Sequence, residues 1–525
     1  MKRILSAVCL YVCTYLAANE IDTWSSPPDT ISSLGVDSSS PHVGMDESGN
    51  VVAIWLEGDV VVSKTKLLGG SWSSADTLSG TGSSSPQVVV DPTTGDAVAI
   101  WNEGGLIKSA NKPFGSSWNS ATTLSASSSS SPQIAIDTAT GDVVAVWVTG
   151  SVVLSDTQLF GMSWTGSPDT LSSSGSSSPQ VAIGSNGTVI ATWQTLNGVS
   201  SLYNINAVSK TLGGSWSTAT LVSNPAFHSV YPQAAVDANG NAVLIWFKYE
   251  LNGLSYSNVI LQSSHRPLAD SWSSPVDISA PGMRNPAYLT SKLLMKDSGG
   301  ALALWTIRPL ESIFTIQSSE SSNYTQWDSP STLDSSLYSY NLDVASNSLG
   351  DAFGIYMTYD SGSDTVLINT TESHIGGINS GFWTNPYTLS DNQNNAFPVI
   401  KSTITGTDCN AIAAWVSSNG TNNVIQASTG TGTLVDPPSN PLVSQFVNDR
   451  DVFQEYYNSI SWTASPDPNL IAYGIYRDGL LIDIVDPSFV TYNDHNQVHN
   501  GAVTYGVTAF DNASTESAIV TVSFP

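Results

Sequence analysis

The sequence predicts an all-β protein built from a four-stranded unit that is repeated along most of its 525 residues. One motif recurs at intervals of 45 to 54 residues: a proline, a short apolar run, an Asp-x-x-Gly type turn and a second apolar run that ends in an aromatic residue. Charged residues make up only 11% of the chain, and small polar residues fill the polar positions, which is typical of β-rich proteins. A repeat of this length indicates an architecture that absorbs a long chain without one large core.

The repeats can be followed from the first proline to the last. Copies start near Pro41, Pro86, Pro132, Pro179, Pro232 and Pro286, a weaker copy starts near Tyr340, and an eighth starts at Pro398. The turn after the first apolar run, such as Asp237-Ala238-Asn239-Gly240, favours a tight hairpin. The second run ends at Trp55, Trp101, Trp147, Trp193, Trp246, Trp305, Tyr356 and Trp415.

Two further strands complete each unit. A third strand, such as Val60-Val61-Val62-Ser63, leads through a Gly-rich turn to a fourth strand that opens with Ser-Trp or a similar pair. The tryptophans of the fourth strands are Trp72, Trp118, Trp164, Trp216, Trp272, Trp327 and Trp383. Four short strands joined by hairpins are typical of a β-propeller blade, and apolar runs such as Val143-Val144-Ala145-Val146-Trp147 fit strands that pack on both faces.

The eighth copy has no Ser-Trp strand of its own. Trp24-Ser25-Ser26-Pro27-Pro28-Asp29-Thr30-Ile31 resembles the outer strand around Trp272, so we expect the N-terminal segment to supply the missing strand. This pairing removes an open sheet edge. The sequence therefore predicts an eight-bladed β-propeller closed by an N-terminal strand, or a seven-bladed one if the copy near Tyr340 is an insertion.

The two ends of the chain differ from the repeats. Residues 1–18 have the pattern of a secretory signal peptide, with Lys2 and Arg3 before an apolar run and Ala17-Ala18 as a cleavage site, so we expect export and no stable membrane insertion after cleavage; an uncleaved anchor is the alternative. We expect the propeller over residues 19–435, a proline-rich linker over 436–441 and a second domain over 442–525. Cleavage would leave Cys409 as the single cysteine, which we expect to be buried.

The C-terminal segment resembles a fibronectin type III domain. The resemblance rests on Trp462, on Tyr473 before the Asp478-Gly479 turn, and on Tyr505, which stands where a tyrosine corner would be. It implies a seven-stranded β-sandwich that acts as a spacer or binding module.

The turn before the fourth strand, as in Gly69-Gly70-Ser71-Trp72, distantly resembles the Asp-box of sialidase-type propellers, although the aspartate is missing. In that family the box is structural, and activity depends on three arginines that bind the substrate carboxylate together with a tyrosine-glutamate pair. Residues 19–435 contain only Arg266, Arg284 and Arg308, and Arg266 lies in the turn before an outer strand. The resemblance therefore supports the fold more than the activity.

Composition and motifs exclude several function classes. The net charge of −27 repels phosphates, so a nucleic-acid partner is not expected. His495 and His499 fall in a predicted loop, and the aspartates at the hairpin turns have a turn-forming role, so no metal is expected. No phosphate-binding loop and no nucleophile elbow is present, so no cofactor is expected either.

Loops on one predicted face are short and serine-rich in the first three units and longer afterwards. Aromatic residues beside charged groups suit a polar ligand such as a carbohydrate or a protein. The candidate ligand residues are Phe227, His228, Tyr231, Lys248, Tyr249, Glu250, Arg284, Arg308, Glu311, Tyr338, Tyr340, Tyr359 and Asp360. The sequence favours an exported, non-catalytic binding or scaffold protein. The alternatives are a sialidase-like glycoside hydrolase and a structural envelope or adhesion component. The longer loops could also merely cover their own strands.

Overall fold

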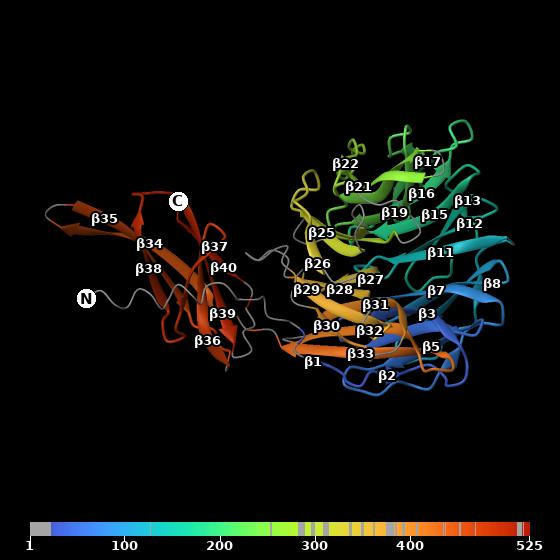
Figure 1. The fold of residues 1–525 in the computed structure, drawn as a ribbon, viewed down its shortest axis with the longest axis horizontal. Coiled ribbons are helices and arrows are strands. Elements are labelled where there is room, and N and C mark those ends of the chain that lie inside the picture. The colour runs from blue at the N-terminus through green and yellow to red at the C-terminus, as the bar shows by residue number, and fades with distance from the viewer. Residues whose placement is uncertain are drawn as a thin grey trace.

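The fold consists of β-strands arranged in small sheets (Figure 1), as a computed structural model shows. The structure describes residues 21, 23–126, 128–252, 255–281, 289–295, 300–307, 314–334, 339–347, 351–360, 363–373, 383, 386–390, 394–405, 408–433, 435, 437–450, 453–467, 469–511, 517 and 519–524. The predicted signal peptide lies outside these residues. In this part of the chain no helix is long and apolar enough to cross a membrane.

Eight sheets cover the repeats, and each begins with the strand that carries the repeated proline. These first strands are β3 (Ser38–Met45), β7 (Ser83–Val90), β11 (Ser129–Ile136), β15 (Ser176–Ile183), β19 (His228–Val236), β23 (Ser291–Met295), β27 (Ser339–Ser346) and β31 (Asn395–Thr405).

The second strand of each sheet follows by a hairpin. The second strands are β4 (Val51–Glu57), β8 (Ala97–Glu103), β12 (Val143–Thr149), β16 (Thr188–Leu196), β20 (Ala242–Asn252), β24 (Ala301–Ile307), β28 (Ala352–Asp360) and β32 (Asp408–Ser418). The third strands are β5 (Val60–Lys66), β9 (Leu106–Lys112), β13 (Val152–Gln158), β17 (Tyr203–Thr211), β21 (Ser255–Arg266), β25 (Thr315–Ser321), β29 (Thr365–Ser373) and β33 (Asn423–Thr433).

The outer strands are short. Seven sheets end with β6 (Asp76–Thr77), β10 (Thr122–Thr123), β14 (Asp169–Thr170), β18 (Thr220–Leu221), β22 (Val276–Asp277), β26 (Ser331–Asp334) and β30 (Tyr387–Thr388). The sheet of β31 is completed by β1 (Thr23–Trp24) and β2 (Asp29–Thr30), which pair with β33. The N-terminal segment therefore supplies the outer strands of the last repeat, as the sequence predicts.

The repeated proline marks a β-bulge in the first strand. In β3 the register shifts between Ser39 and His42, and Ser40 has a φ of 52°. Pro41 cannot donate a ladder hydrogen bond, so it is tolerated where the bulge interrupts the ladder. The residue before this position has a positive φ in seven sheets: Ser40, Ser85, Ser131, Ser178, Tyr231, Asn341 and Phe397.

The core of the repeats lies between neighbouring sheets. The aromatic residues that end the second apolar runs, from Trp55 to Trp415, are fully buried, because both faces of the second strands are covered. Cys409 is also buried and makes no disulfide. Along the chain each first strand lies against the next, and β31 lies against β3. The first strands thus follow one another in cyclic order.

The C-terminal segment forms two further sheets, drawn in orange to red in Figure 1. One contains β34 (Ser439–Arg450), β35 (Phe453–Thr463) and β38 (Thr491–Gln497). The other contains β36 (Leu470–Arg477), β37 (Leu480–Val485), β39 (Val503–Asp511) and β40 (Val520–Phe524). Trp462, Tyr473 and Tyr505 are buried together in the core of this segment.

Two details of this segment differ from the sequence predictions. Strand β34 begins at Ser439, inside the expected linker, because Asn440 and Pro441 form another proline bulge, with a φ of 50° at Asn440. The Tyr505 hydroxyl donates to the Asp494 carboxylate at 2.6 Å instead of to a backbone carbonyl. The hydroxyl with a backbone partner belongs to Tyr473, which accepts from the Ser465 amide at 2.9 Å.

Candidate functional site

Four ionisable side chains from four first strands meet where these strands lie against one another. His42 comes from β3, Lys292 from β23, Asp343 from β27 and Lys401 from β31, and we call them the central cluster. His42, Lys292 and Asp343 occupy equivalent positions, since each pairs with the residue before the buried aromatic of its second strand. Lys401 lies two residues beyond the corresponding position of β31.

The Lys292 Nζ atom lies 2.8 Å from Asp343 Oδ1, and the other carboxylate oxygen, Oδ2, accepts the Ile400 amide at 3.1 Å. Enclosure by protein alone would raise the pKa of Asp343, but the charges of Lys292 and Lys401 outweigh it and hold the pKa below its usual value. Solvent still reaches the pair, because the side chains of Lys292 and Asp343 are 39% and 15% exposed. Asp343 is therefore a carboxylate at neutral pH.

His42 is neutral at physiological pH. Desolvation, with the charge of Lys401 next in size, lowers its pKa to about 4. Its Nδ1 atom accepts the Val88 amide at 3.3 Å, which places the proton of the neutral imidazole on Nε2. His42 can therefore donate a hydrogen bond through Nε2 but cannot act as a base at that atom.

Lys401 is the cluster's candidate proton acceptor. Desolvation lowers the pKa of its ammonium group, the charge of Asp343 opposes that effect, and the charge of Lys292 adds to it. The residue as a whole nevertheless keeps surface that solvent can reach. A lysine with a lowered pKa that solvent can reach is suited to general-base chemistry.

Two exposed aromatic side chains stand on first strands: Phe397 on β31, which also carries Lys401, and Tyr231 on β19, which lies against β23. Tyr231 and Phe397 occupy the bulge position, where four other sheets have serine. They are 44% and 58% exposed, in spite of the positive φ that disfavours a bulky residue there. Exposed rings on a strand of the cluster or on the strand beside it suit stacking against a sugar.

The structure gathers four of the predicted ligand residues, but it packs them together instead of exposing them. The His228 ring stacks on Tyr249 with centroids 4.9 Å apart, and both side chains are buried. The Lys248 Nζ atom lies 5.1 Å from the centre of the Phe227 ring and 3.3 Å from Asp277 Oδ1. Phe227 and His228 were expected in one loop and Lys248 and Tyr249 in the next, but β19 begins at His228 and β20 continues through Tyr249, so His228 and Tyr249 become cross-strand partners.

The other predicted residues are spread over several sheets. Glu250 accepts a hydrogen bond from Asn258 at 3.0 Å, the Tyr359 hydroxyl donates to Asp364 at 2.7 Å, and Asp360 accepts from Ser363 at 2.7 Å. Tyr340 lies on β27, three residues before Asp343. Arg284, Arg308, Glu311 and Tyr338 lie outside the described residues.

Sequence reasoning missed the central cluster, although a signal was present. The residue after the repeated proline is Gln87, Gln133, Gln180 and Gln233 in four copies and His42 in the first. Lys292 and Asp343 stand at the equivalent register in copies that lack the proline at that point. An alignment of the repeat copies would have shown ionisable residues at the position where four copies have glutamine.

No protein-family model matches the chain, and no curated protein matches it. Among solved structures, the polysaccharide lyase Uly1 gives a TM-score of 0.41 at 8% identity, with 75% of this chain and 89% of that chain covered. The Penicillium chrysogenum alpha-L-arabinanase complexed with arabinobiose gives 0.32 at 12% identity, covering 57% and 92%. Prolyl oligopeptidase B from Galerina marginata gives 0.37 at 9% identity, covering 72% and 55%.

These neighbours correct the main functional prediction. The sequence favoured a non-catalytic binding or scaffold protein, whereas the neighbours are enzymes, and several are named for the processing of carbohydrates. The difference lies in the named activities of the neighbours and does not itself assign a role to this chain. At these identities and TM-scores, neither their substrates nor their site residues carry over to this chain.

Proposed function

We propose that this protein is a carbohydrate-processing enzyme that acts on an acidic saccharide held at the central cluster. The observation that carries the proposal is the composition of the cluster: two lysines, one ion-paired aspartate and one neutral histidine. With both lysines protonated its net charge is positive, in a chain whose overall charge is −27. A local cationic site in an acidic protein favours an anionic group of the substrate, such as the carboxylate of a uronic acid.

The roles follow from the protonation states. Lys292 and the Nε2–H group of His42 would bind the sugar carboxylate and withdraw charge from the adjacent carbon. The neutral form of the Lys401 amine would take the proton from that carbon. The electron pair of the C–H bond forms a C=C bond, the C–O bond to the next sugar breaks, and the leaving oxygen takes a proton from the Lys401 ammonium group.

Elimination fits these residues better than hydrolysis. Glycoside hydrolysis generally uses two carboxyl groups on either side of the scissile bond. The central cluster contributes a single carboxylate, and Asp343 is engaged by Lys292 and by the Ile400 amide. Of the three arginines that the sialidase alternative would use, the structure describes Arg266, which donates to the Asp270 carbonyl at 2.7 Å in an outer turn.

The proposal includes the architecture that holds the site. We infer that the eight sheets are the blades of one closed propeller, which the contact of β31 with β3 and the pairing of β1 with β33 support. We also infer that residues 442–525 form a fibronectin type III-like sandwich, and that residues 1–18 direct export.

A kinetic assay tests the function. The full-length protein is incubated with polyuronate chains, and the conjugated product is followed by its ultraviolet absorbance. Lys401→Met should lower kcat by about 100-fold or more, the usual effect of losing a general base. The matched control is Lys64→Met on β5, which should keep full activity. Absence of cleavage, or full activity in Lys401→Met, would overturn the proposal.

A further inference from the structure

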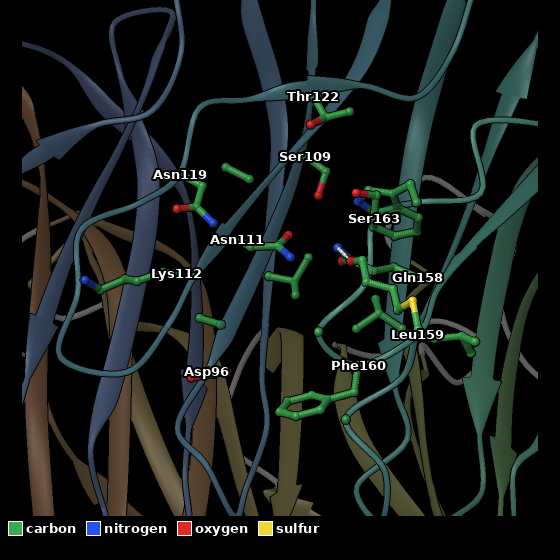
Figure 2. Close-up of a pocket in the computed structure, with 18 of the residues that line it drawn as sticks. Asp96, Ser109, Asn111, Lys112, Asn119, Thr122, Gln158, Leu159, Phe160 and Ser163 are labelled. Carbon is green, nitrogen blue, oxygen red and sulfur yellow. Dashed lines mark hydrogen bonds between the residues drawn. The ribbon is translucent and has the colours of Figure 1, made fainter.

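A cavity of about 510 Å³ lies between the sheet of β7–β10 and the sheet of β11–β14, away from the central cluster. Figure 2 shows its two walls. Ser109 and Asn111 on β9 point into the space from one side, and Gln158 at the end of β13 points toward them from the other. A volume of this size is within the range of small-molecule sites in proteins.

Three polar atoms on these walls are buried and have no hydrogen-bond partner: Ser109 Oγ, Gln158 Oε1 and Trp164 Nε1. Their residues are 1%, 6% and 8% exposed. The Gln158 amide is oriented by its Nε2 atom, which donates to the Met162 carbonyl at 2.8 Å, while Oε1 has no hydrogen-bond partner. A buried polar atom without a partner costs free energy, so a ligand that supplies partners would recover it.

At equivalent boundaries between other sheets, a tryptophan Nε1 atom and a serine Oγ atom form a hydrogen bond with each other. Trp327 Nε1 donates to Ser263 Oγ, and Trp383 Nε1 donates to Ser318 Oγ, each at 2.8 Å across a boundary between sheets. Ser109 and Trp164 are the corresponding pair here, and their bond is not made. The same hydrogen bond is also missing between Ser63 and Trp118 and between Ser155 and Trp216, so its absence alone does not define a site. The cavity and the free Gln158 oxygen make this boundary different.

The charged groups of the cavity already form hydrogen bonds within the protein. This favours a neutral ligand over a charged one. Asp156 Oδ1 accepts the Thr157 amide at 2.7 Å, Asp91 Oδ1 accepts the Thr93 amide at 2.8 Å, and Asp96 Oδ1 accepts the Phe114 amide at 2.7 Å. Lys112 donates to the Ser116 carbonyl. The buried groups without a partner are therefore one N–H donor, one amide acceptor and one hydroxyl that can do both.

We propose that this cavity binds a short neutral saccharide, at a site separate from the proposed catalytic centre. Sugar hydroxyls donate and accept at once, so one can donate to Gln158 Oε1 while another accepts from Trp164 Nε1. The Trp164 ring adds an apolar surface for a sugar face. The site would hold a glycan chain without cleaving it.

The test is calorimetric binding of neutral trisaccharides (gluco-, xylo-, manno- and arabino-oligosaccharides) to the full-length protein. Ser109→Ala removes the hydroxyl, and Trp164→Phe removes the N–H group together with part of the ring; each should weaken binding by about 5- to 10-fold. The matched control is Ser263→Ala, which breaks the Trp327 bond at another boundary and should leave the Kd unchanged. Thermal unfolding of each variant checks that it is folded.

Two outcomes would overturn the proposal. One is a Kd weaker than about 10 mM for every trisaccharide tested. The other is unchanged affinity in both folded variants, which would place any binding elsewhere. Binding that survives in Lys401→Met separates this site from the proposed catalytic function, because that substitution removes the proposed base without touching the cavity.

Discussion

One carboxylate joins three consecutive first strands. Asp343 Oδ1 lies 2.8 Å from Lys292 Nζ on the preceding first strand, β23, and Asp343 Oδ2 accepts the Ile400 amide on the following one, β31. The same carboxylate offsets part of the desolvation of Lys401. Asp343 therefore has a structural and an electrostatic role, and removing its charge should affect both.

The substitution Asp343→Asn should lower the free energy of unfolding by about 1–2 kcal/mol, because two partly enclosed ammonium groups lose their counter-charge while solvent still screens them. It should also lower the pKa of Lys401 further. Urea denaturation measures the first effect. The control, Asp277→Asn, breaks the pair of Lys248 with a half-exposed carboxylate and should change stability by less than about 0.5 kcal/mol. Equal effects of the two substitutions would contradict this account.

Stability should depend on pH through His42. Its pKa is about 4 in the folded protein, below the ordinary value of 6.5, so between these values the unfolded chain binds a proton that the folded protein does not. The stability contributed by His42 is therefore complete above pH 6.5 and falls by roughly 3 kcal/mol as the pH drops toward 4.

The variant His42→Gln, which introduces the residue found at the same position in four other sheets, should remove this component. Urea midpoints measured across the pH range test it, with His499→Gln as the control. A His42→Gln curve parallel to that of the wild type would show that His42 is not the group responsible.

The close packing of the N-terminal segment depends on Gly430 of β33. A Cβ atom there would lie 2.7 Å from Ile21 Cγ2 and 3.0 Å from the Trp24 ring. Gly430→Ala should therefore cost about 1–3 kcal/mol of stability through overpacking. Gly198→Ala, where no atom lies within 4 Å of the new Cβ, should be nearly neutral. Thermal unfolding distinguishes the two, and a neutral Gly430→Ala would argue against this packing in solution.

Tyr231 should contribute to substrate binding more than to the fold. Tyr231→Ser places at the bulge the residue that four other sheets have there, so the backbone should accept it. Loss of the exposed ring should raise KM about 5-fold with little change in kcat, since stacking contributes about 1 kcal/mol. Steady-state kinetics on polyuronate chains would show this. A fall in kcat at constant KM would assign Tyr231 a different role.

The repeated sheets could be predicted from the sequence because each repeat carries its own local signals. The proline, the hairpin turn and the buried aromatic recur at nearly constant spacing, and Trp24 could be placed by its likeness to Trp272. The positive φ at Tyr231 could not be read from one copy. It becomes apparent only when the bulge before each proline is known.

The candidate site could not be predicted in the same way, because it depends on contacts between distant repeats. His42 and Lys401 are 359 positions apart in the sequence and meet only through the contact of β3 with β31. His228 and Tyr249 were predicted as ligand residues from their local character alone. Their aromatic and polar character suggested a ligand site, but the extension of β19 and β20 makes them partners in a ladder.

The most direct test of the central claim is the mass of the products released from a polyuronate chain by the wild-type protein and by Lys401→Met. Elimination leaves a product lighter by one water molecule than the product of hydrolysis, because no water is added across the broken bond. We expect the lighter product from the wild type and almost none from Lys401→Met. Products of hydrolytic mass, or an intact polymer after prolonged incubation with the wild type, would contradict the proposed chemistry of the central cluster.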